Sequence, residues 1–541
     1  MAHAGFEPVE TGEFDAVVIG AGLAGLYMLY RLRELGLATI VFETGDGVGG
    51  TWYWNRYPGA RCDSPSLFYS YSFSPELLQE WSWSSRYPTQ AEILSYINHV
   101  ADRFDLRRDI RFNARVTTAA YDDARRRWVV ETERGDRVSA KYCIAAVGCL
   151  SAGQAPKIPG LESFRGEWYH TGAWPHEPVE LRGKRIGVVG TGSSGVQVIP
   201  TVAPLASHLY VFQRTANFSI PARNAPRNEQ VERETKAHYA ELWKAIRMTK
   251  GGLLAPPATA KALDVSEEER QRVYEERWAA GGSGFAGAFT DLLTDTAAND
   301  TAADFVRSKI RATVADPVVA EALCPKDHPL GTKRLVLDTD YFETYNRPNV
   351  TLVDVRKAPI QEITPTGIRT ADAEYELDMI IFATGYNAMT GPLLSIDIRG
   401  QGGVQLREKW QAGPRTYLGV SIAGFPNLFT ITGPGSPSVL TNMVVAIEQH
   451  VEWVADCIDY LEEHHIAAIE PDVAAEDAWV EHVNEKANAT LYPLANSWYM
   501  GANIPGKPRV FMPYVGGLDV YTVTCNEIAA EGYRGFALTT G

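Results

Sequence analysis

The feature that most constrains this chain is a glycine-rich turn near its start, Gly20-Ala-Gly22-Leu-Ala-Gly25. The apolar residues 15–20 before it predict a short buried strand, and the apolar spacing from Leu23 onward predicts a helix up to residue 36. Gly20 permits the tight turn, Gly22 lets the backbone approach a diphosphate, and Gly25 allows close packing of the helix. The N-terminus of that helix offers amide donors to phosphates. The pattern therefore predicts a βαβ unit that binds a dinucleotide.

A carboxylate stands where such a unit binds a ribose. Residues 38–43 form the next expected strand and end in Glu43. An acid at this position binds ribose hydroxyls and disfavours a 2′-phosphate, so the first unit is expected to hold FAD or NAD. A glycine-rich turn without a ligand is the structural alternative, and the position of Glu43 argues against it.

A second unit of the same kind begins at residue 184. An apolar strand over 184–190, a helix over 191–205 and a strand over 209–214 are expected around a second glycine-rich turn. This second strand ends in Arg214 and Thr215 and carries no carboxylate. A guanidinium there can pair with a 2′-phosphate, which favours NADPH over NADH, although an arginine at this place could also be a solvated surface residue. The turn consists of Gly190, Thr191, Gly192, Ser193, Ser194 and Gly195.

The chain of 541 residues is too long for one core, so several domains are expected. Residues from 228 to 327 are helix-forming and charged, whereas strand patterns return at 350–355, 379–383 and 428–432 and precede a long amphipathic helix. The expected fold class is α/β, with two Rossmann-like dinucleotide-binding domains and a helical insertion. The expected segments are 1–150 and 390–541 for the FAD-binding domain, 151–227 and 332–389 for the NADP-binding domain, and 228–331 for the insertion.

Composition excludes several partners. The net charge of −15 argues against nucleic acid and anionic membranes, and no apolar run reaches the roughly 18 to 20 residues that span a bilayer. The six cysteines are scattered without a C-x-x-C pair or metal-ligand spacing. They indicate a cytoplasmic protein without a metal site, and they argue against a disulfide reductase, which needs a close redox pair. A monomer or small homo-oligomer is expected.

Two longer segments carry the most specific patterns: residues 164–175 fit F-x-G-x-x-x-H-x-x-x-W-P, and residues 49–63 begin with Gly-Gly-Thr-Trp. Residues 378–386 form an apolar strand that ends in Ala-Thr-Gly-Tyr, a weak signal alone that supports the order of the elements. With these segments the chain resembles the type I Baeyer–Villiger monooxygenases throughout its length. The resemblance implies a two-dinucleotide flavoprotein with FAD in the first unit and NADPH in the second. Gly50, Thr51 and Trp52 belong to the extended FAD fingerprint that it indicates.

The resemblance also implies roles for single residues. Arg334 matches the active-site guanidinium, Asp63 the carboxylate that positions it, and Lys333 a second contact to the NADP phosphate. Trp498 lies in a segment similar to the family's mobile segment over bound NADP. His170 precedes the second nucleotide-binding strand, which predicts a place in the linker between domains and a role in coupling NADP binding to domain motion.

The implied reaction converts a ketone and O2 into an ester or lactone. In the family, NADPH reduces FAD, oxygen adds as a C4a-peroxyflavin, and the unprotonated peroxide attacks the ketone carbonyl. An arginine suits such a site because it stays charged and does not act as an acid. Lysine would be less suitable because its proton is more easily lost.

The chain resembles most the phenylacetone and steroid monooxygenase branch, in the segment from Gly433 to Met443. Ser438 and Val439 correspond to an extra turn beside the substrate pocket, and Met443 to a cofactor contact. Cys149, followed by Leu150, stands where the phenylacetone pattern has glutamine. The smaller and less polar cysteine predicts acceptance of bulkier or more aliphatic ketones than phenylacetone.

Two other functions share parts of this pattern. A flavin monooxygenase that oxidises nitrogen or sulfur would have both glycine-rich turns, but the Trp174-Pro175 ending and Arg334 argue against it. A catalytically silent nucleotide-binding sensor would keep the turns without turnover, and substrate-dependent NADPH consumption would exclude it.

Overall fold

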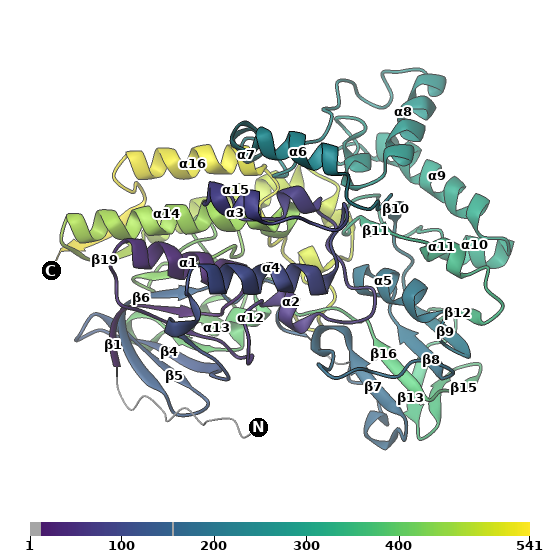
Figure 1. Ribbon diagram of the computed structural model, residues 1–541, viewed down its shortest axis with the longest axis horizontal. Helices are drawn as coiled ribbons and strands as arrows, with labels where there is room; N and C mark the ends of the chain where they lie inside the picture. Colours follow the sequence, from purple (N-terminus) through teal and green to yellow (C-terminus); the bar gives the residue numbers. More distant parts are fainter. Residues whose placement is uncertain (1–11, 154–155, 541) are drawn as a thin grey trace.

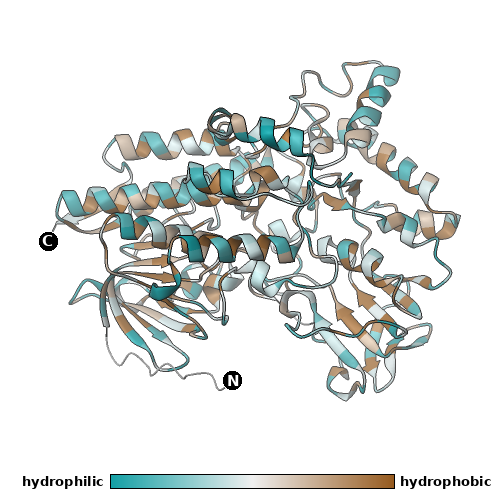
Figure 2. Ribbon diagram, in the orientation of Figure 1, coloured by the Kyte–Doolittle hydropathy of each residue, from teal (hydrophilic) through white to brown (hydrophobic). Residues whose placement is uncertain are grey.

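The computed structural model describes residues 12–153 and 156–540. The first eleven residues of the predicted FAD-binding domain, residues 154–155 of the predicted NADP-binding segment and Gly541 lie outside the described residues. Figure 1 shows two sheet-containing bodies side by side, with a group of helices above the second body. In Figure 2 the most hydrophobic residues concentrate on the strands of both sheets and on one side of the helices.

The first body is built on a mostly parallel sheet with strand order β17-β4-β5-β6-β1-β2-β3, and β18 also pairs with β6. Its centre is parallel: Val17 of β1 lies opposite Ile40 of β2 and Cys143 of β6. The last four residues of β1 are fully buried because helices cover this part of the sheet. The bounds are β1 Gly12–Ile19, β2 Thr39–Phe42, β3 Ile110–Arg111, β4 Val116–Asp122, β5 Arg127–Thr132, β6 Arg137–Ala145, β17 Asp397–Arg399 and β18 Leu428–Thr430.

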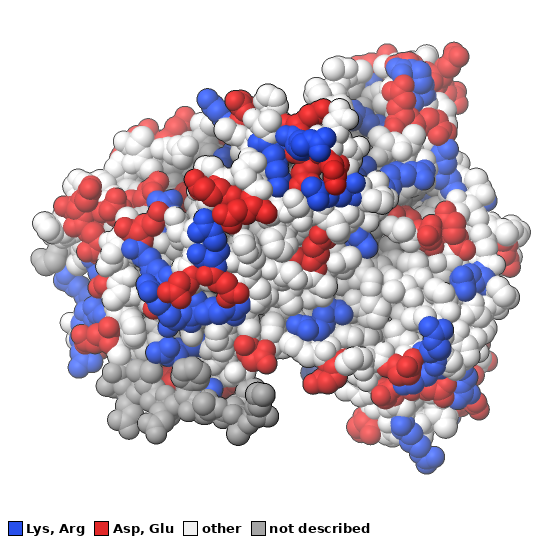
Figure 3. Space-filling view, viewed as in Figure 1, with Lys and Arg blue, Asp and Glu red and all other residues white. Residues whose placement is uncertain are grey.

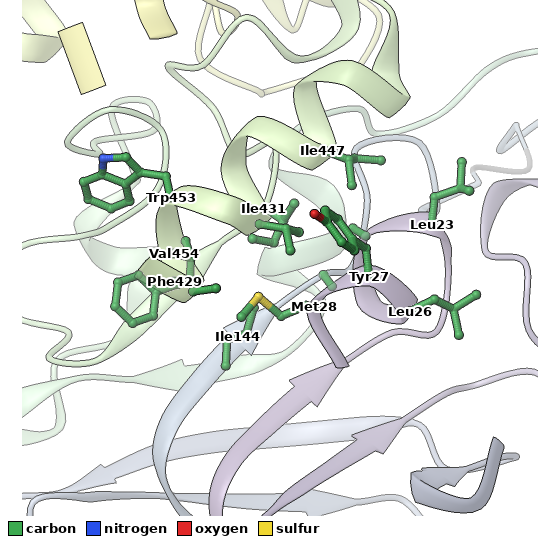
Figure 4. Close-up of a cluster of buried hydrophobic side chains, with 14 of the residues drawn as sticks. Leu23, Leu26, Tyr27, Met28, Ile144, Phe429, Ile431, Ile447, Trp453 and Val454 are labelled. Carbon is green, nitrogen blue, oxygen red and sulfur yellow. The ribbon is translucent and has the colours of Figure 1, made fainter. Parts of the chain in front are cut away.

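Helices from both ends of the chain pack on this sheet. α1 (Leu23–Glu34) lies against α14 (Met443–Glu463), and between them apolar side chains form the core drawn in Figure 4. Leu26 and Met28 come from α1, Ile144 from β6, and Val454 from α14. The C-terminal part of the chain therefore completes the body that the N-terminal part begins. The other helices here are α3 Pro75–Glu80, α4 Gln90–Arg103, α15 Val473–Asn488 and α16 Leu518–Ala530.

The second body contains a five-stranded, fully parallel sheet with the order β12-β9-β8-β16-β7. Strands β8 and β9 and the helix α5 between them form the second βαβ unit that the sequence predicts. The ends differ from the expected ones by one to three residues. The bounds are β7 Glu167–His170, β8 Arg185–Val189, α5 Ser193–Val202, β9 His208–Gln213, β12 Val350–Asp354 and β16 Met379–Phe382.

The segment between the two halves of the second body is helical, as predicted, but its helices join two different cores. Tyr239, Trp243 and Ile246 of α7 pack into the core of the first body, whereas Tyr274 of α8 and Phe305 of α9 pack into that of the second. The segment thus bridges the two bodies. The bounds are α6 Glu229–Ala237, α7 Tyr239–Arg247, α8 Glu267–Ala280, α9 Thr296–Thr313 and α10 Pro317–Leu323.

Two antiparallel meanders were not expected from the sequence. One is β4-β5-β6, and the other is β13-β14-β15, a small sheet beside the second body. The second meander consists of β13 Ile360–Thr364, β14 Gly367–Thr370 and β15 Glu374–Glu376.

Acidic and basic side chains are interspersed over the face shown in Figure 3. Within the described residues, no helix has the length and apolar character needed to cross a bilayer.

Candidate active site

The first glycine-rich turn has the geometry of a diphosphate cradle. Gly20 has a φ of +104°, and a Cβ on Gly25 would lie 1.8 Å from the carbonyl oxygen of Gly20. Only glycine fits at either position. The N-cap of α1 is Gly22, and among the described residues no side chain caps the first amides of this helix or places a carboxylate in its first turn. These amides therefore suit an external anion.

Glu43 is held beside this turn at the end of β2. Its two carboxylate oxygens accept hydrogen bonds from the amides of Ala21 and Gly45, both at 2.7 Å. Burial raises the pKa of Glu43, and these backbone amides partly offset the effect. Each oxygen retains a lone pair that can accept a ribose hydroxyl.

The Gly50-Thr51-Trp52 fingerprint lies directly on the first turn. Gly50 has a φ of +53°, and a Cβ there would be 2.9 Å from the Cα of Gly22. Thr51 and Trp52 form the start of a short helix, α2 (Thr51–Trp54), and the indole nitrogen of Trp52 donates to the Tyr69 hydroxyl at 3.0 Å. The structure thus brings two fingerprint segments, some 30 residues apart in sequence, into contact.

The second turn repeats the geometry of the first. Gly190 has a φ of +110°, and a Cβ on Gly195 would lie 2.2 Å from the carbonyl oxygen of Gly190. A Cβ on Gly192 would meet no described residue within 4 Å, so within this part of the chain the space over the N-cap of α5 is open. Thr191 donates its hydroxyl to the Thr215 carbonyl at 2.9 Å and joins the turn to the end of β9. Ser193 and Ser194 form the first turn of α5.

Arg214 belongs to a group of cations at this end of β9. Burial lowers the pKa of Lys333; Asp327 partly offsets this, and the positive charges of Arg214 and Arg356 lower it further. Asp327 also lies 3.5 Å from Arg356 in an ion pair. The residues present fit a phosphate dianion, which would relieve the repulsion among the three cations. Arg356 was missed in the sequence, because a single arginine after a strand carries no motif.

Arg334 and Asp63 form a two-pronged ion pair. Nη2 of Arg334 lies 2.7 Å from both carboxylate oxygens of Asp63, and its Nε lies 3.1 Å from one of them. Nη1 donates to the Val439 carbonyl at 2.8 Å. The charge of Asp63 raises the pKa of Arg334 further above its ordinary value, despite burial. This guanidinium is therefore a fixed positive charge.

An apolar cluster adjoins this ion pair through Val439 and Tyr499 and contains most of the predicted pocket residues. Cys149 and Val439 are buried in it, and Leu150, Met443 and Trp498 pack against it. Burial raises the pKa of the Cys149 thiol to about 11, an effect that a hydrogen bond with Ser438 partly offsets. The cluster also contains Tyr499, missed in the sequence, which hydrogen-bonds Arg334. The fixed cation therefore adjoins an apolar wall.

The predicted linker position of His170 is wrong. His170 ends β7, an edge strand that pairs with β16 and places His170 opposite Phe382. The strand joins the sheet because its backbone groups satisfy the open edge of β16. Nδ1 of His170 accepts from the Gly172 amide at 3.0 Å, and the ring lies edge-on to Tyr386 at 6.0 Å. Among the described residues its hydrogen bonds do not reach Arg334.

Contacts between the two bodies adjoin the site. Tyr386 donates its hydroxyl to Asn55, and the Gln197 side chain of α5 bonds the backbone of Arg61. At Gly59, whose φ is +84°, a Cβ would lie 2.4 Å from the carbonyl oxygen of Gln197. The segment that leads to Asp63 is therefore pressed against the helix of the second turn. Two dinucleotide cradles and one half-buried cation fixed by a carboxylate define a two-dinucleotide oxidoreductase.

Comparisons with known proteins agree with this class. A family model described as pyridine nucleotide-disulphide oxidoreductase matches residues 17–277. The chain is 47% identical over 525 residues to a Baeyer-Villiger monooxygenase of Pseudooceanicola batsensis, covering 96% of this chain and 95% of that protein. It is 44% identical over 530 residues to the phenazine N-monooxygenase PhzNO1 of Lysobacter antibioticus, covering 97% of each. A solved structure of oxidised steroid monooxygenase bound to NADP has a TM-score of 0.94 at 56% identity, covering 98% of this chain and 100% of that one.

The chain belongs to the Baeyer–Villiger monooxygenase family. The predicted α/β fold class with two dinucleotide-binding domains is confirmed. Disulfide chemistry, which the description of the matched family model mentions, has no counterpart in the described residues, where all six cysteines are buried and free.

Proposed function

We propose that this protein is an FAD- and NADPH-dependent monooxygenase that inserts one oxygen atom of O2 beside a ketone carbonyl to give an ester or lactone. The second oxygen atom leaves as water, with NADPH supplying the electrons. The observation that carries the proposal is the Arg334–Asp63 pair, set in an apolar cluster next to both dinucleotide cradles. Such a fixed cation in a dry site stabilises an oxyanion.

The residues divide between the two cofactors by their chemistry. Glu43, the amides of α1 and the Gly50 to Trp52 segment would hold FAD, which when bound and reduced supplies the activation of oxygen. The amides of α5 with Arg214 and Lys333 would hold the diphosphate and 2′-phosphate of NADPH. Trp498 and Met443 line the apolar cluster, where they would exclude water from the reacting atoms.

Arg334 acts as a charge and not as an acid. Asp63 raises its pKa, so it keeps its proton and stabilises negative charge on the oxidant and on the former carbonyl oxygen. Asp63 fixes the guanidinium plane by accepting from Nε and Nη2, and the Val439 carbonyl accepts from Nη1. His170, on β7 beside Tyr386, is proposed to couple NADP binding to movement between the two bodies.

Replacement of the arginine tests this role. Arg334→Ala should retain FAD but abolish ester formation, and Arg334→Lys should restore only a small part, because a single ammonium cannot reproduce the pair with Asp63. Loss of one oxyanion-stabilising group of this kind lowers turnover about 100- to 1000-fold. The measurements are the FAD content and the ester formed per NADPH consumed. Turnover of Arg334→Ala at the wild-type rate would contradict the assignment.

The pocket walls suggest the substrate class. Cys149 is small, buried and beside Val439, so we propose ketones bulkier or more aliphatic than phenylacetone as substrates. The similarity to a structure named as a steroid monooxygenase supports this choice. Turnover of phenylacetone, cyclic ketones and long-chain ketones should be compared under saturating NADPH. A strict preference for phenylacetone would contradict this expectation.

Oxidation of nitrogen or sulfur is the alternative, and a relative named for N-oxidation makes it worth testing. An apolar wall around a fixed guanidinium favours an attacking anion over a protonated oxidant. Product analysis with a ketone, a thioether and an aromatic amine in parallel separates the two functions. Ester formation below the rates of both other oxidations would overturn the proposal.

The domain division is part of the proposal. Pairing of β17 and β18 with strands of the first half supports residues 1–150 and 390–541 as the FAD-binding domain. The shared sheet of β8, β9, β12 and β16 supports 151–227 and 332–389 as the NADP-binding domain. We further propose a cytoplasmic monomer or small homo-oligomer, which the free cysteines support.

A further inference from the structure

Several buried residues with side chains have a left-handed backbone near the candidate active site, and three of them are linked by hydrogen bonds that meet at Thr432. They are Leu418 with a φ of +59°, Thr432 with +54° and Ser438 with +42°. All three are buried. This conformation is strained for a β-branched or bulky residue, so the surrounding structure has to hold it. Thr432 and Ser438 both belong to the segment 432–439, which connects β18 to the Arg334 site.

A buried histidine and a buried tyrosine hold two of these strained residues. The Thr432 amide donates to Nδ1 of His450 on α14 at 3.0 Å. The Tyr521 hydroxyl of α16 lies 2.5 Å from the Leu418 carbonyl and 2.9 Å from Nε2 of His450. One small hydrogen-bond chain thus joins Leu418 to Thr432 through two helices.

The donors and acceptors in this series of hydrogen bonds determine the tautomer of His450. A carbonyl only accepts, so the single hydroxyl proton of Tyr521 goes to Leu418. Nε2 of His450 then donates to the tyrosine oxygen, and Nδ1 is left bare to accept from the Thr432 amide. His450 is therefore neutral with its proton on Nε2. Burial lowers its pKa to about 4, an effect that the Thr430 carbonyl partly offsets, so this state persists at neutral pH.

Packing fixes the same groups in place. His450 and Tyr521 stack with ring centroids 5.5 Å apart. Ile431, the residue before Thr432, packs into the apolar core beside α14, as Figure 4 shows. The amide of Thr432 therefore meets a histidine that has little freedom to move.

The held segment leads directly to the arginine. The Ser438 hydroxyl donates to the Thr432 carbonyl at 3.1 Å, and the next residue, Val439, accepts from Nη1 of Arg334 at 2.8 Å. Ser438 also hydrogen-bonds the Cys149 thiol of the pocket wall. A displacement at Thr432 would thus reach both the guanidinium and the pocket.

We propose that His450 and Tyr521 are positioning residues that hold the strained segment 432–439. They thereby keep the Val439 carbonyl and the pocket wall in their positions relative to Arg334. The inference rests on the proposed role of Arg334. Neither residue is offered as a catalytic residue: both act through the backbone of segment 432–439. Misplacement of a reacting group by about 1 Å lowers rates about 100-fold.

Three replacements at His450 and Tyr521 distinguish a positioning role from a general effect on stability. His450→Leu removes the acceptor for the Thr432 amide, His450→Asn keeps an acceptor oxygen near Nδ1, and Tyr521→Phe keeps the ring and removes the hydroxyl. The readout is the fraction of consumed NADPH that yields ester, measured against hydrogen peroxide formed. We expect this fraction to fall about 10- to 100-fold in His450→Leu and less in His450→Asn and Tyr521→Phe. The rate of FAD reduction by NADPH under anaerobic conditions should stay within about 2-fold, since the turns that hold both cofactors are unchanged.

Relief of strain supplies a second test. Glycine adopts a φ of +54° without cost, so Thr432→Gly combined with His450→Leu should recover at least about half of the lost ester yield. Trp453→Phe is the matched control, because Trp453 is also on α14 and bonds the backbone of α16, at the Cys525 carbonyl, without touching segment 432–439. It should lower thermal stability while keeping the ester yield.

The outcomes are distinct. Equal ester yields in wild type and His450→Leu, equal losses in His450→Leu and His450→Asn, or no recovery in the double variant would each overturn the inference. If His450→Leu does not fold, Tyr521→Phe and His450→Asn decide by the same ratio. A wild-type protein that forms no ester from any ketone would instead contradict the proposed function.

Discussion

Lys333 and Arg334 are neighbours in sequence with opposite electrostatic surroundings. Lys333 faces the cations Arg214 and Arg356, and burial together with their charge lowers its pKa. Arg334 faces Asp63, which raises its pKa. One short segment therefore supplies a cation that lacks a full counter-charge and a cation that has one. The first suits an incoming phosphate, and the second suits charge that develops during a reaction.

The 2′-phosphate assignment predicts a change of cofactor selectivity. Arg214→Ala should raise the KM for NADPH about 10- to 100-fold, which corresponds to ~1.5–3 kcal/mol for a charge-assisted hydrogen bond. The KM for NADH should change by less than about 3-fold, because NADH has no phosphate at that place. Steady-state kinetics with both nucleotides measure this. Arg182→Ala, an exposed arginine of the same body, is the control, and a similar rise in both variants would contradict the assignment.

At the scale of elements, α14 connects the site to the helical segment. Its first residue, Met443, packs against the pocket cluster, and His450 one to two turns later meets Thr432. Glu448, fully buried on the same helix, accepts from Ser72 and forms an ion pair with Arg247 of α7 at 3.1 Å. The helix therefore anchors α7 to the first body through a buried charge pair.

Glu448 predicts a pH-dependent stability. Burial raises its pKa to about 6 from 4.5, an effect that Arg247 partly offsets, so the folded protein holds this proton more tightly than the unfolded chain. Its stabilising contribution is complete below about pH 4.5 and is lost as the pH rises through 6. Relative to Glu448→Gln, the wild type should lose up to ~2 kcal/mol over that range. The difference in Tm between the two proteins, measured from pH 5 to pH 8, tests this.

The exposed Glu463 at the end of α14 provides the control for that measurement. The Tm difference between wild type and Glu463→Gln should vary less with pH than that of Glu448→Gln. Equal pH dependence in both variants would show that the buried position of Glu448 has no part in it.

For the whole molecule, the arrangement of the two bodies determines the site. Asp63 lies in the first body and Arg334 follows the helical segment, 271 residues later. The segment that carries Asp63 is pressed against α5 at Gly59, and Tyr386 bonds Asn55 across the same boundary. The ion pair at the centre of the site thus depends on how closely the two bodies approach.

Substitution of Gly59 tests this dependence. Both Gly59 and Gly36 have a positive φ, +84° and +73°, but only at Gly59 would a Cβ collide with the neighbouring body. Gly36→Ala has nothing within 4 Å and carries the backbone strain alone. Gly59→Ala should therefore lower Tm further and slow the reduction of FAD by NADPH about 10-fold or more. Anaerobic stopped-flow measurements give the rate of FAD reduction in both variants. Equal rates in Gly59→Ala and Gly36→Ala would contradict a role for this contact.

Local sequence determined the two dinucleotide units and the class of protein. The turns at Gly20 and Gly190 require glycine for backbone reasons that act within a few residues, and Glu43 and Arg214 follow at fixed distances along the next strand. These features can be predicted because strand, turn and helix depend on residues that are close in sequence. The fingerprint segments beside them added the family.

Tertiary structure determined the contacts between residues that are far apart in sequence, which local patterns do not predict. The pairing of Arg334 with Asp63, the cation group at Arg356 and the place of His170 on an edge strand join segments that are far apart in sequence. The hydrogen bond between His450 and Thr432 also joins distant segments, and neither residue lies in a sequence pattern that predicts it. Such contacts arise when hydrophobic burial brings distant elements together and buried polar groups then find partners, so their pattern lies in the packed molecule and not in the spacing of residues along the chain.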